Sequence, residues 1–260
     1  MKASPTWLRR SLQNALRIAG LLLVCTVALQ IVFVARIALM VVLDPQSTTF
    51  QRSEAWRLLV QKQQIAWAQD WVDNDRIADH LKRAVIVSED AGFVDHSGVD
   101  WDAVEKAWGR NQKAAERVER RAAKAPPVLK PGQKPAVAKI VGGSTITQQL
   151  AKNLFLSGER TVLRKAQELL LTLTLEALLS KQRILEIYLN NVEWGEGLFG
   201  AQAAARHYFG VDAARLGPEQ AARLAVMLPA PKRFEARPGS AYVVGRAATI
   251  QARMGGVALP

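Results

Sequence analysis

The segment RTVLRKAQELLLTLTLEALLSK, residues 160–181, decides the predicted fold because its apolar residues lie on nearly every side of a helix. A helix that is apolar all round is normally buried, so we predict a central buried helix here. Helical patterns recur at residues 53–69, 76–90, 181–191, 201–209, 218–228 and 240–254, and no run alternates for long as a strand does. The chain is therefore predicted to be mainly α.

One acidic residue lies in the first half of this apolar segment. Glu168 follows Arg164 by one helical turn, and an ion pair between them is the structural interpretation. A carboxylate in a predicted core helix is also a candidate functional group. Glu176 and Glu186 are further candidates on the same grounds.

The preceding stretch, GGSTITQQLAKNLFLSGER at residues 142–160, predicts a second helix. Thr145 and Gln148 have the spacing of a capping box, which places the helix start near Ser144. Apolar residues follow at every fourth position and predict a buried stripe: Ile146, Leu150 and Leu154.

The rest of this helix is unusually polar. A helix N-terminus with free amides, hydroxyls and a nearby lysine suits an anion. The candidate anion-binding residues are Ser144, Gln148, Gln149 and Lys152, extended by Arg160 and Arg164. The alternative is a well-capped helix with a solvated face, which this stretch alone supports about equally.

A third candidate region is SEDAGFVDHSGVDW, residues 88–101, where Glu89 and Asp90 directly follow an apolar helical run. Acidic residues at the C-terminal end of a helix are unfavourable for its dipole. Either burial or function must then justify them. Two solvated carboxylates at a helix end are the structural alternative, slightly favoured on this stretch alone.

The N-terminal part has the composition of a membrane anchor. Residues 18–35 carry no charge, and apolar residues resume after Arg36 and stop before Asp44. Basic residues precede the run, so residues 1–17 are predicted to be cytoplasmic, residues 18–43 to span the membrane and residues 44–260 to form the extracytoplasmic domain. A cleaved signal peptide is the alternative, although its apolar region is usually shorter.

The net charge of +12 predicts an anionic partner, but much of it lies in the N-terminus and in residues 110–139. That segment is rich in lysine and arginine and ends in prolines, so we predict a frayed helix and a flexible insertion. It is either a solvated loop or a basic arm on anionic lipid. Nucleic acid is not an expected partner, the histidines lack metal-ligand spacing, and a lone Cys25 excludes an internal disulfide.

Five ordered blocks of this sequence resemble the peptidoglycan glycosyltransferases. They are EDAGFVDHSGVDW, GGSTITQQLAKNLFLS, RKAQELLLTLTLE, ILEIYLNNVEWGEGLFGAQAAARHYFG and EQAARLAVMLPAP. The resemblance implies a lysozyme-like fold with two lobes, in the single-domain form behind one transmembrane helix. Gly92 and Trp194 depart from the family pattern, as does the long insertion.

The resemblance also implies an activity. The family polymerises lipid II into β-1,4-linked glycan strands and releases polyprenyl diphosphate. Its catalytic base falls on Glu89 and its second important glutamate on Glu168. Ser144, Gln148, Gln149, Lys152, Arg160 and Arg164 match positions associated with the diphosphate and sugars of the substrate.

Partners and rival functions follow from the same resemblance. We expect lipid II, the growing glycan chain and the cytoplasmic membrane as partners, possible cell-wall synthesis or division proteins, and no certain cofactor beyond a divalent cation assisting the diphosphate. One rival is a lysozyme-like lytic transglycosylase or muramidase, in which a carboxylic acid must protonate the leaving group. The other rival is a non-enzymatic scaffold of wall synthesis.

Overall fold

The computed structural model describes residues 6–124, 143–159 and 161–260, which are largely helical. This confirms the predicted mainly α class. The helices are α1 Thr6–Leu39, α2 Thr49–Lys62, α3 Asp79–Glu89, α4 Trp101–Lys124, α5 Ile146–Phe155, α6 Val162–Leu178, α7 Lys181–Asn191, α8 Ala201–Phe209, α9 Pro218–Met227, α10 Pro231–Phe234 and α11 Ala241–Arg253.

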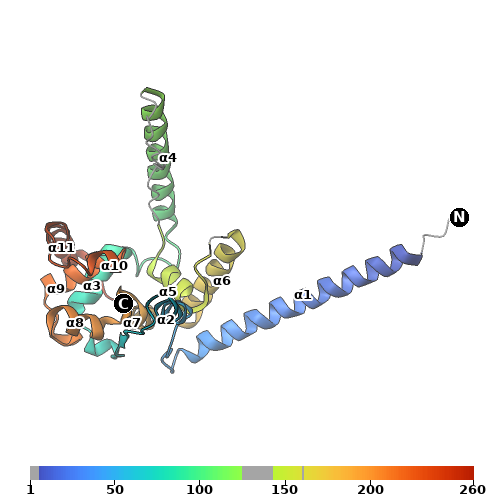
Figure 1. The fold of residues 1–260 in the computed structure, drawn as a ribbon, viewed down its shortest axis with the longest axis horizontal. Coiled ribbons are helices and arrows are strands. Elements are labelled where there is room, and N and C mark those ends of the chain that lie inside the picture. The colour runs from blue at the N-terminus through green and yellow to red at the C-terminus, as the bar shows by residue number, and fades with distance from the viewer. Residues whose placement is uncertain (1–5, 125–142, 160) are drawn as a thin grey trace.

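The helices of the body form two packed groups (Figure 1). In one group α3 packs on α9 and α11, and in the other α5 packs on α2, α6 and α7. Most of the buried apolar residues of both groups belong to one continuous core. The candidate residues at the end of α3 and along α5 and α6 are thus carried by helices from both groups.

A small sheet joins segments that are far apart in the sequence. It has the order β1-β3-β2, with β1 Ala68–Gln69, β2 Glu193–Gly195 and β3 Leu198–Phe199. Gly197, in the turn between β2 and β3, has a φ of 70°, and a Cβ there would lie 2.0 Å from the carbonyl oxygen of Ala66. Gly197 is therefore required by the tight turn and by the close approach of the Ala66 backbone.

The predicted start and buried stripe of α5 are confirmed. Thr145 caps the helix and forms the expected capping box with Gln148. Ile146, Leu150 and Leu154 are each at most 1% exposed. Because this stripe fixes the rotation of α5, Gln149 and Lys152 are turned away from the core, whereas Thr147 and Gln148 are buried.

The prediction of a central buried helix at residues 160–181 is wrong. α6 buries only Glu168, Leu171, Thr172 and Leu175, whereas Val162 and Leu163 are 87% and 83% exposed. One face of α6 packs on α5, and part of the other side contacts α1. The apolar residues on the uncovered face gave the segment its all-round apolar pattern without placing it in the core.

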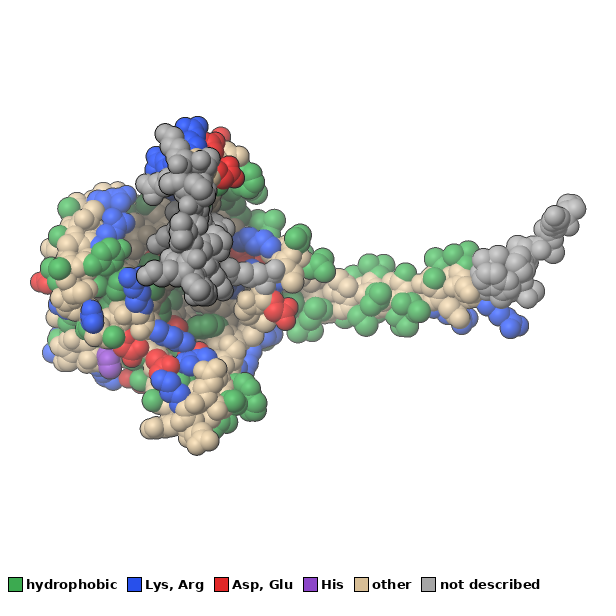
Figure 2. Space-filling view, turned by 45° about the horizontal axis from the view of Figure 1, so that its top comes forward, with side chains coloured by type: hydrophobic (Ala, Val, Ile, Leu, Met, Phe, Trp, Pro, Cys, Tyr) green, Lys and Arg blue, Asp and Glu red, His purple; other side chains and the backbone are tan. Residues whose placement is uncertain are grey.

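Two long helices project from the body (Figure 1). Residues 10–39 of α1 are long and apolar enough to cross a membrane. Its apolar side chains are exposed along most of its length and form the extension in Figure 2. The other projection is α4, which contains the first half of the predicted basic insertion; residues 125–139 lie outside the described part of the chain.

The C-terminal end of α1 is docked on the body. Ile37 is fully buried, and the ring of Phe33 meets that of Phe155 edge-on at 5.4 Å. Closer to the N-terminus of α1, the side-chain amides of Gln30 and of Gln167 on α6 exchange two hydrogen bonds of 2.8 and 3.0 Å. The apolar helix is therefore attached to α5 and α6, the two helices that carry most of the candidate residues.

Candidate active site

Asp90 fixes the position of the adjacent Glu89. It follows the last residue of α3 and is buried. Its Oδ2 accepts a hydrogen bond of 3.0 Å from the amide of Ile146 at the start of α5, and its Oδ1 lies 2.9 Å from Nε2 of His96. An acidic side chain at a helix N-terminus is electrostatically favourable, so Asp90 joins the end of α3 to the start of α5.

Glu89 lies at the end of a chain of hydrogen bonds. The Tyr188 hydroxyl donates to Oε1 of Gln149 over 3.0 Å, and Nε2 of Gln149 donates to Oε2 of Glu89 over 2.9 Å. Tyr188 thereby orients the amide so that its donor faces the carboxylate. Burial raises the pKa of Glu89 above its ordinary value, and the hydrogen bond from Gln149 offsets part of this increase.

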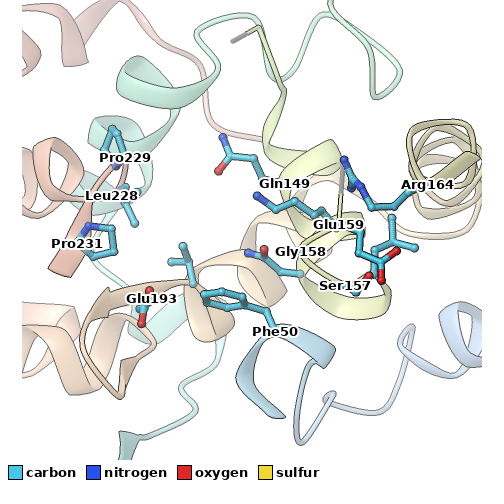
Figure 3. Close-up of a pocket in the computed structure, with 14 residues that line it drawn as sticks. Phe50, Gln149, Ser157, Gly158, Glu159, Arg164, Glu193, Leu228, Pro229 and Pro231 are labelled. Carbon is cyan, nitrogen blue, oxygen red and sulfur yellow. The ribbon is translucent and has the colours of Figure 1, made fainter. Parts of the chain in front are cut away.

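Two cavities flank the Glu89–Gln149 pair. Glu89 lines the smaller cavity, of about 240 Å³, together with Asp100, Arg110 and Ser144. Gln149 lines the larger cavity, of about 410 Å³, which Figure 3 shows between α5 and α6 on one side and the segment after α9 on the other. The Glu89 carboxylate therefore lies where the two cavities approach each other.

The larger cavity has a cationic wall. Lys152 from α5 and Arg164 from α6 both line it. Lys152 is exposed to the cavity, but the surrounding protein removes enough water to lower its pKa, while the nearby Glu168 acts in the opposite direction. The cavity thus offers an ammonium and a guanidinium for an anion.

Glu168 is buried behind this wall and is paired with two cations. Its Oε2 accepts a hydrogen bond of 2.8 Å from Nη1 of Arg164, and its Oε1 pairs with Nζ of Lys165. The ion pair with Arg164 expected from the sequence is confirmed. Because both oxygens are occupied by cations, Glu168 has the geometry of a residue that orients Arg164 rather than that of a base.

The other sequence candidates lie in different surroundings. Ser144 lines the smaller cavity, whereas the Gln148 side chain is buried in the capping box and accepts a hydrogen bond from the amide of Thr145. Arg160 lies outside the described residues. Glu176 pairs with Lys181, and Glu186 pairs with Arg183, both at 2.8 Å and away from the two cavities.

Two residues near the cavities were not identified from the sequence. Tyr188 reaches Gln149 from α7, and Glu193 on β2 lines the larger cavity. Both lie in the ILEIYLNNVEWGEGLFG block that carries the family resemblance, but no local pattern distinguishes them. Their roles depend on contacts with residues distant in the sequence.

The described residues do not fit a metal ion held by the protein. They contain no group of three or more His, Cys, Asp or Glu side chains that could hold one. Glu89 is engaged by Gln149, and Glu168 is engaged by Arg164 and Lys165. A divalent cation that assists a diphosphate stays a prediction of the sequence.

Comparison with known proteins decides the family. The sequence model described as transglycosylase matches residues 58–120 and 133–255. The chain belongs to the transglycosylase family. The stretch between the two matched parts, residues 121–132, lies within the predicted insertion. The boundaries of this insertion and of the other predicted domains stay predictions.

Individual relatives of this transglycosylase cover most of its length. It is 48% identical over 90% of its chain to a biosynthetic peptidoglycan transglycosylase of Burkholderia orbicola, covering 86% of that protein. The protein of the same name from Bordetella pertussis is 49% identical over 84% of this chain and 82% of its own. The family resemblance identified from the five sequence blocks is therefore confirmed.

Proposed function

We propose that this transglycosylase polymerises lipid II into β-1,4-linked glycan strands and releases polyprenyl diphosphate. One observation carries the proposal: the partly desolvated Glu89 carboxylate lines one cavity and is hydrogen-bonded to Gln149, which lines a second cavity that has a wall of Lys152 and Arg164. A reaction between two sugar substrates requires two adjacent binding sites around one base. The family membership and the relatives named above support the same reaction class.

Glu89 is the proposed general base. The bond forms when the 4-hydroxyl of the acceptor sugar attacks the anomeric carbon of the donor, and the configuration at that carbon inverts because the α-linked donor yields a β-linked product. The hydroxyl proton passes to a Glu89 oxygen as attack proceeds. A raised pKa suits this step, since a base works best when its pKa lies nearer the operating pH.

The leaving group explains the cationic wall. The bond that breaks joins the anomeric carbon to a lipid diphosphate, which leaves with the electron pair as a stable anion. It needs positive charge and hydrogen-bond donors rather than a proton, and Lys152 and Arg164 offer both. Glu168 is proposed to hold Arg164 in position from behind.

The same chemistry argues against the lytic rival. A lysozyme-type hydrolase expels a sugar alkoxide and needs a carboxylic acid to protonate it. Within the part of the chain described here, the Glu89 oxygen Oε2 faces the Gln149 amide, and the second glutamate is neutralised by two cations. A pure scaffold has no need for this arrangement of charge.

Two assays with the purified full-length protein distinguish between these functions. The protein is incubated separately with lipid II and with finished peptidoglycan, and the products are separated by size. We expect glycan polymer from lipid II and no fragments from peptidoglycan. Fragments from peptidoglycan without polymerisation of lipid II would identify a lytic enzyme, and no reaction with either would support the scaffold.

We also propose that α1 anchors the catalytic domain on the outer face of the cytoplasmic membrane. The basic residues Lys2, Arg9, Arg10 and Arg17 precede the apolar run, which favours a cytoplasmic N-terminus. Protease added to spheroplasts should digest the domain. Complete protection of the domain until the cells are lysed would reverse the proposed orientation.

A further inference from the structure

Two carboxyl groups line the larger cavity: Glu159 lies on the same side as Arg164, and Glu193 lies on the opposite wall (Figure 3). Glu193 lies on β2 and is 7% exposed. Its Oε1 is buried and accepts no hydrogen bond from any described residue. A buried carboxylate oxygen whose contact with its nearest ammonium is loose can still accept a hydrogen bond from a ligand.

The neighbouring charges leave Glu193 only partly compensated. Nζ of Lys232, on α10, lies 3.3 Å from its Oε1 but donates to Oε1 of Glu54 over 2.5 Å. Glu54 is also held by Arg57, its neighbour on α2. One lysine is thus shared between two carboxylates, with its hydrogen bond made to Glu54.

The ionisation of Glu193 reflects these surroundings. Burial raises its pKa to about 7, Lys232 acts against this increase, and Glu54 reinforces it, while Arg57 lowers the pKa slightly. A carboxyl group with this pKa is part protonated near neutral pH. A ligand that donates a hydrogen bond favours the ionised form, because charge-assisted hydrogen bonds are the stronger ones.

The lining around Glu193 fits a sugar rather than a phosphate. Phe50, Leu228, Pro229 and Pro231 give this end of the cavity an apolar surface, whereas the cations lie on the opposite wall. Sugar rings combine apolar C–H faces with hydroxyl and amide donors. Near Glu193 an anionic group meets a carboxylate and apolar side chains, whereas on the opposite side Lys152 and Arg164 outnumber the one carboxylate there, Glu159.

We propose that Glu193 is a specificity-determining residue that accepts a hydrogen bond from a hydroxyl or N-acetyl N–H of the disaccharide of lipid II while Lys152 and Arg164 hold the diphosphate. The proposal rests on the proposed function, because it assigns the two ends of that substrate to the two walls of one cavity. Binding then requires both a diphosphate and a sugar, and a lipid diphosphate alone uses only one wall.

The test compares binding of lipid II with binding of polyprenyl diphosphate, which lacks the sugars. Full-length protein carrying Glu89→Gln is used throughout so that lipid II is not consumed. The additional variants are Glu193→Gln and, as a matched control in the turn that follows β2, Glu196→Gln. Glu196 pairs with Arg57 and Lys62 and does not line the cavity. Affinities are measured at about pH 6 and about pH 8, on either side of the Glu193 pKa of about 7.

Glu193→Gln should weaken lipid II binding about tenfold or more at the higher pH, the effect expected from loss of a hydrogen bond to a charged group. The loss should be smaller at the lower pH, where Glu193 is already largely protonated. The affinity for polyprenyl diphosphate should be unchanged by this substitution. Glu196→Gln should bind both ligands with the affinities of the parent protein.

Two other outcomes have distinct meanings. If Glu193→Gln binds lipid II like the parent protein at both values of pH, or loses affinity for both ligands equally, the assignment of Glu193 is wrong and the proposed function stands. If the parent protein binds neither ligand, the proposed function itself fails and the assignment fails with it.

Discussion

The regions around Glu89 and Glu168 place the same type of side chain in opposite surroundings. Glu89 receives its described hydrogen bond from the neutral amide of Gln149, and burial raises its pKa. Glu168 is more deeply buried but is held by Arg164 and Lys165. The difference teaches that burial alone does not make a base: cations occupy both oxygens of Glu168, whereas the Glu89 carboxylate lacks a cationic partner among the described residues and burial raises its pKa.

The largest expected effect tests the first half of this comparison. Glu89→Gln keeps the shape of the side chain and removes the base, so polymerisation of lipid II should fall about a hundredfold to ten-thousandfold. The rate is measured with the melting temperature as a control for folding. Near-normal synthesis by a folded variant would remove Glu89 from the catalytic role.

The next largest effect concerns Lys152, a cation close to Glu168 in the wall of the larger cavity. Lys152→Ala should weaken binding of lipid II about tenfold to a hundredfold, because a hydrogen bond from a charged donor contributes roughly 1.5–3 kcal/mol. Binding of a phosphate-free glycan fragment should hardly change. Lys62→Ala is the control, since Lys62 pairs with Glu196 away from the cavity. Equal losses for both ligands would assign Lys152 to the fold.

The role of Glu168 predicts a change in pH dependence. Burial lowers the pKa of Lys152 and Glu168 raises it, so Glu168→Gln should lower this pKa further. Only protonated Lys152 attracts a diphosphate, and affinity is lost as the pH rises through its pKa. The alkaline loss of lipid II binding should therefore begin at lower pH in the variant. Glu196→Gln is the control. If the alkaline loss of lipid II binding occurs at the same pH in Glu168→Gln as in the parent protein, Glu168 does not influence the pKa of Lys152.

The smallest effect concerns how α6 is held from its outer side. Gln30 of α1 and Gln167 of α6 exchange two hydrogen bonds, and a hydrogen bond between neutral groups contributes about 1 kcal/mol net. In a double-mutant cycle of Gln30→Leu and Gln167→Leu, the double variant should be little less stable in detergent than either single variant. Thr26→Val is the control, because Thr26 bonds only within α1. Fully additive losses would show that the pair is not coupled.

Much of the candidate site could be predicted because its signals are local. Two local patterns define α5 within a dozen residues: the capping box of Thr145 and Gln148, and an apolar residue at every fourth position. The pair of Arg164 and Glu168 is likewise one helical turn long. The family blocks added Glu89, which local pattern alone left as a solvated helix end.

The failures occurred where a partner is distant in the sequence. The apolar residues of α6 predicted burial, but periodicity does not record which neighbours cover a helix, and Val162 and Leu163 remain exposed. Gln149 reaches Glu89 across 60 positions of sequence, which no local pattern predicts, whereas Gln148 closes the predicted capping box with Thr145 three positions away. The two side chains point in different directions because packing of the apolar stripe in the core fixes the rotation of α5.

The sequence by itself determined the helices, their caps, the apolar N-terminal run and the family, since each depends on a short pattern or an ordered set of blocks. Only the tertiary structure decided the surroundings of the carboxylates. Tyr188 meets Gln149 across 39 positions of sequence, and Glu193 shares Lys232 with Glu54 because α10 packs on β2 and the Lys232 side chain also reaches Glu54 of α2. Desolvation and charge act through space over a few ångströms, so the pKa of a side chain depends on neighbours that the order of residues does not reveal.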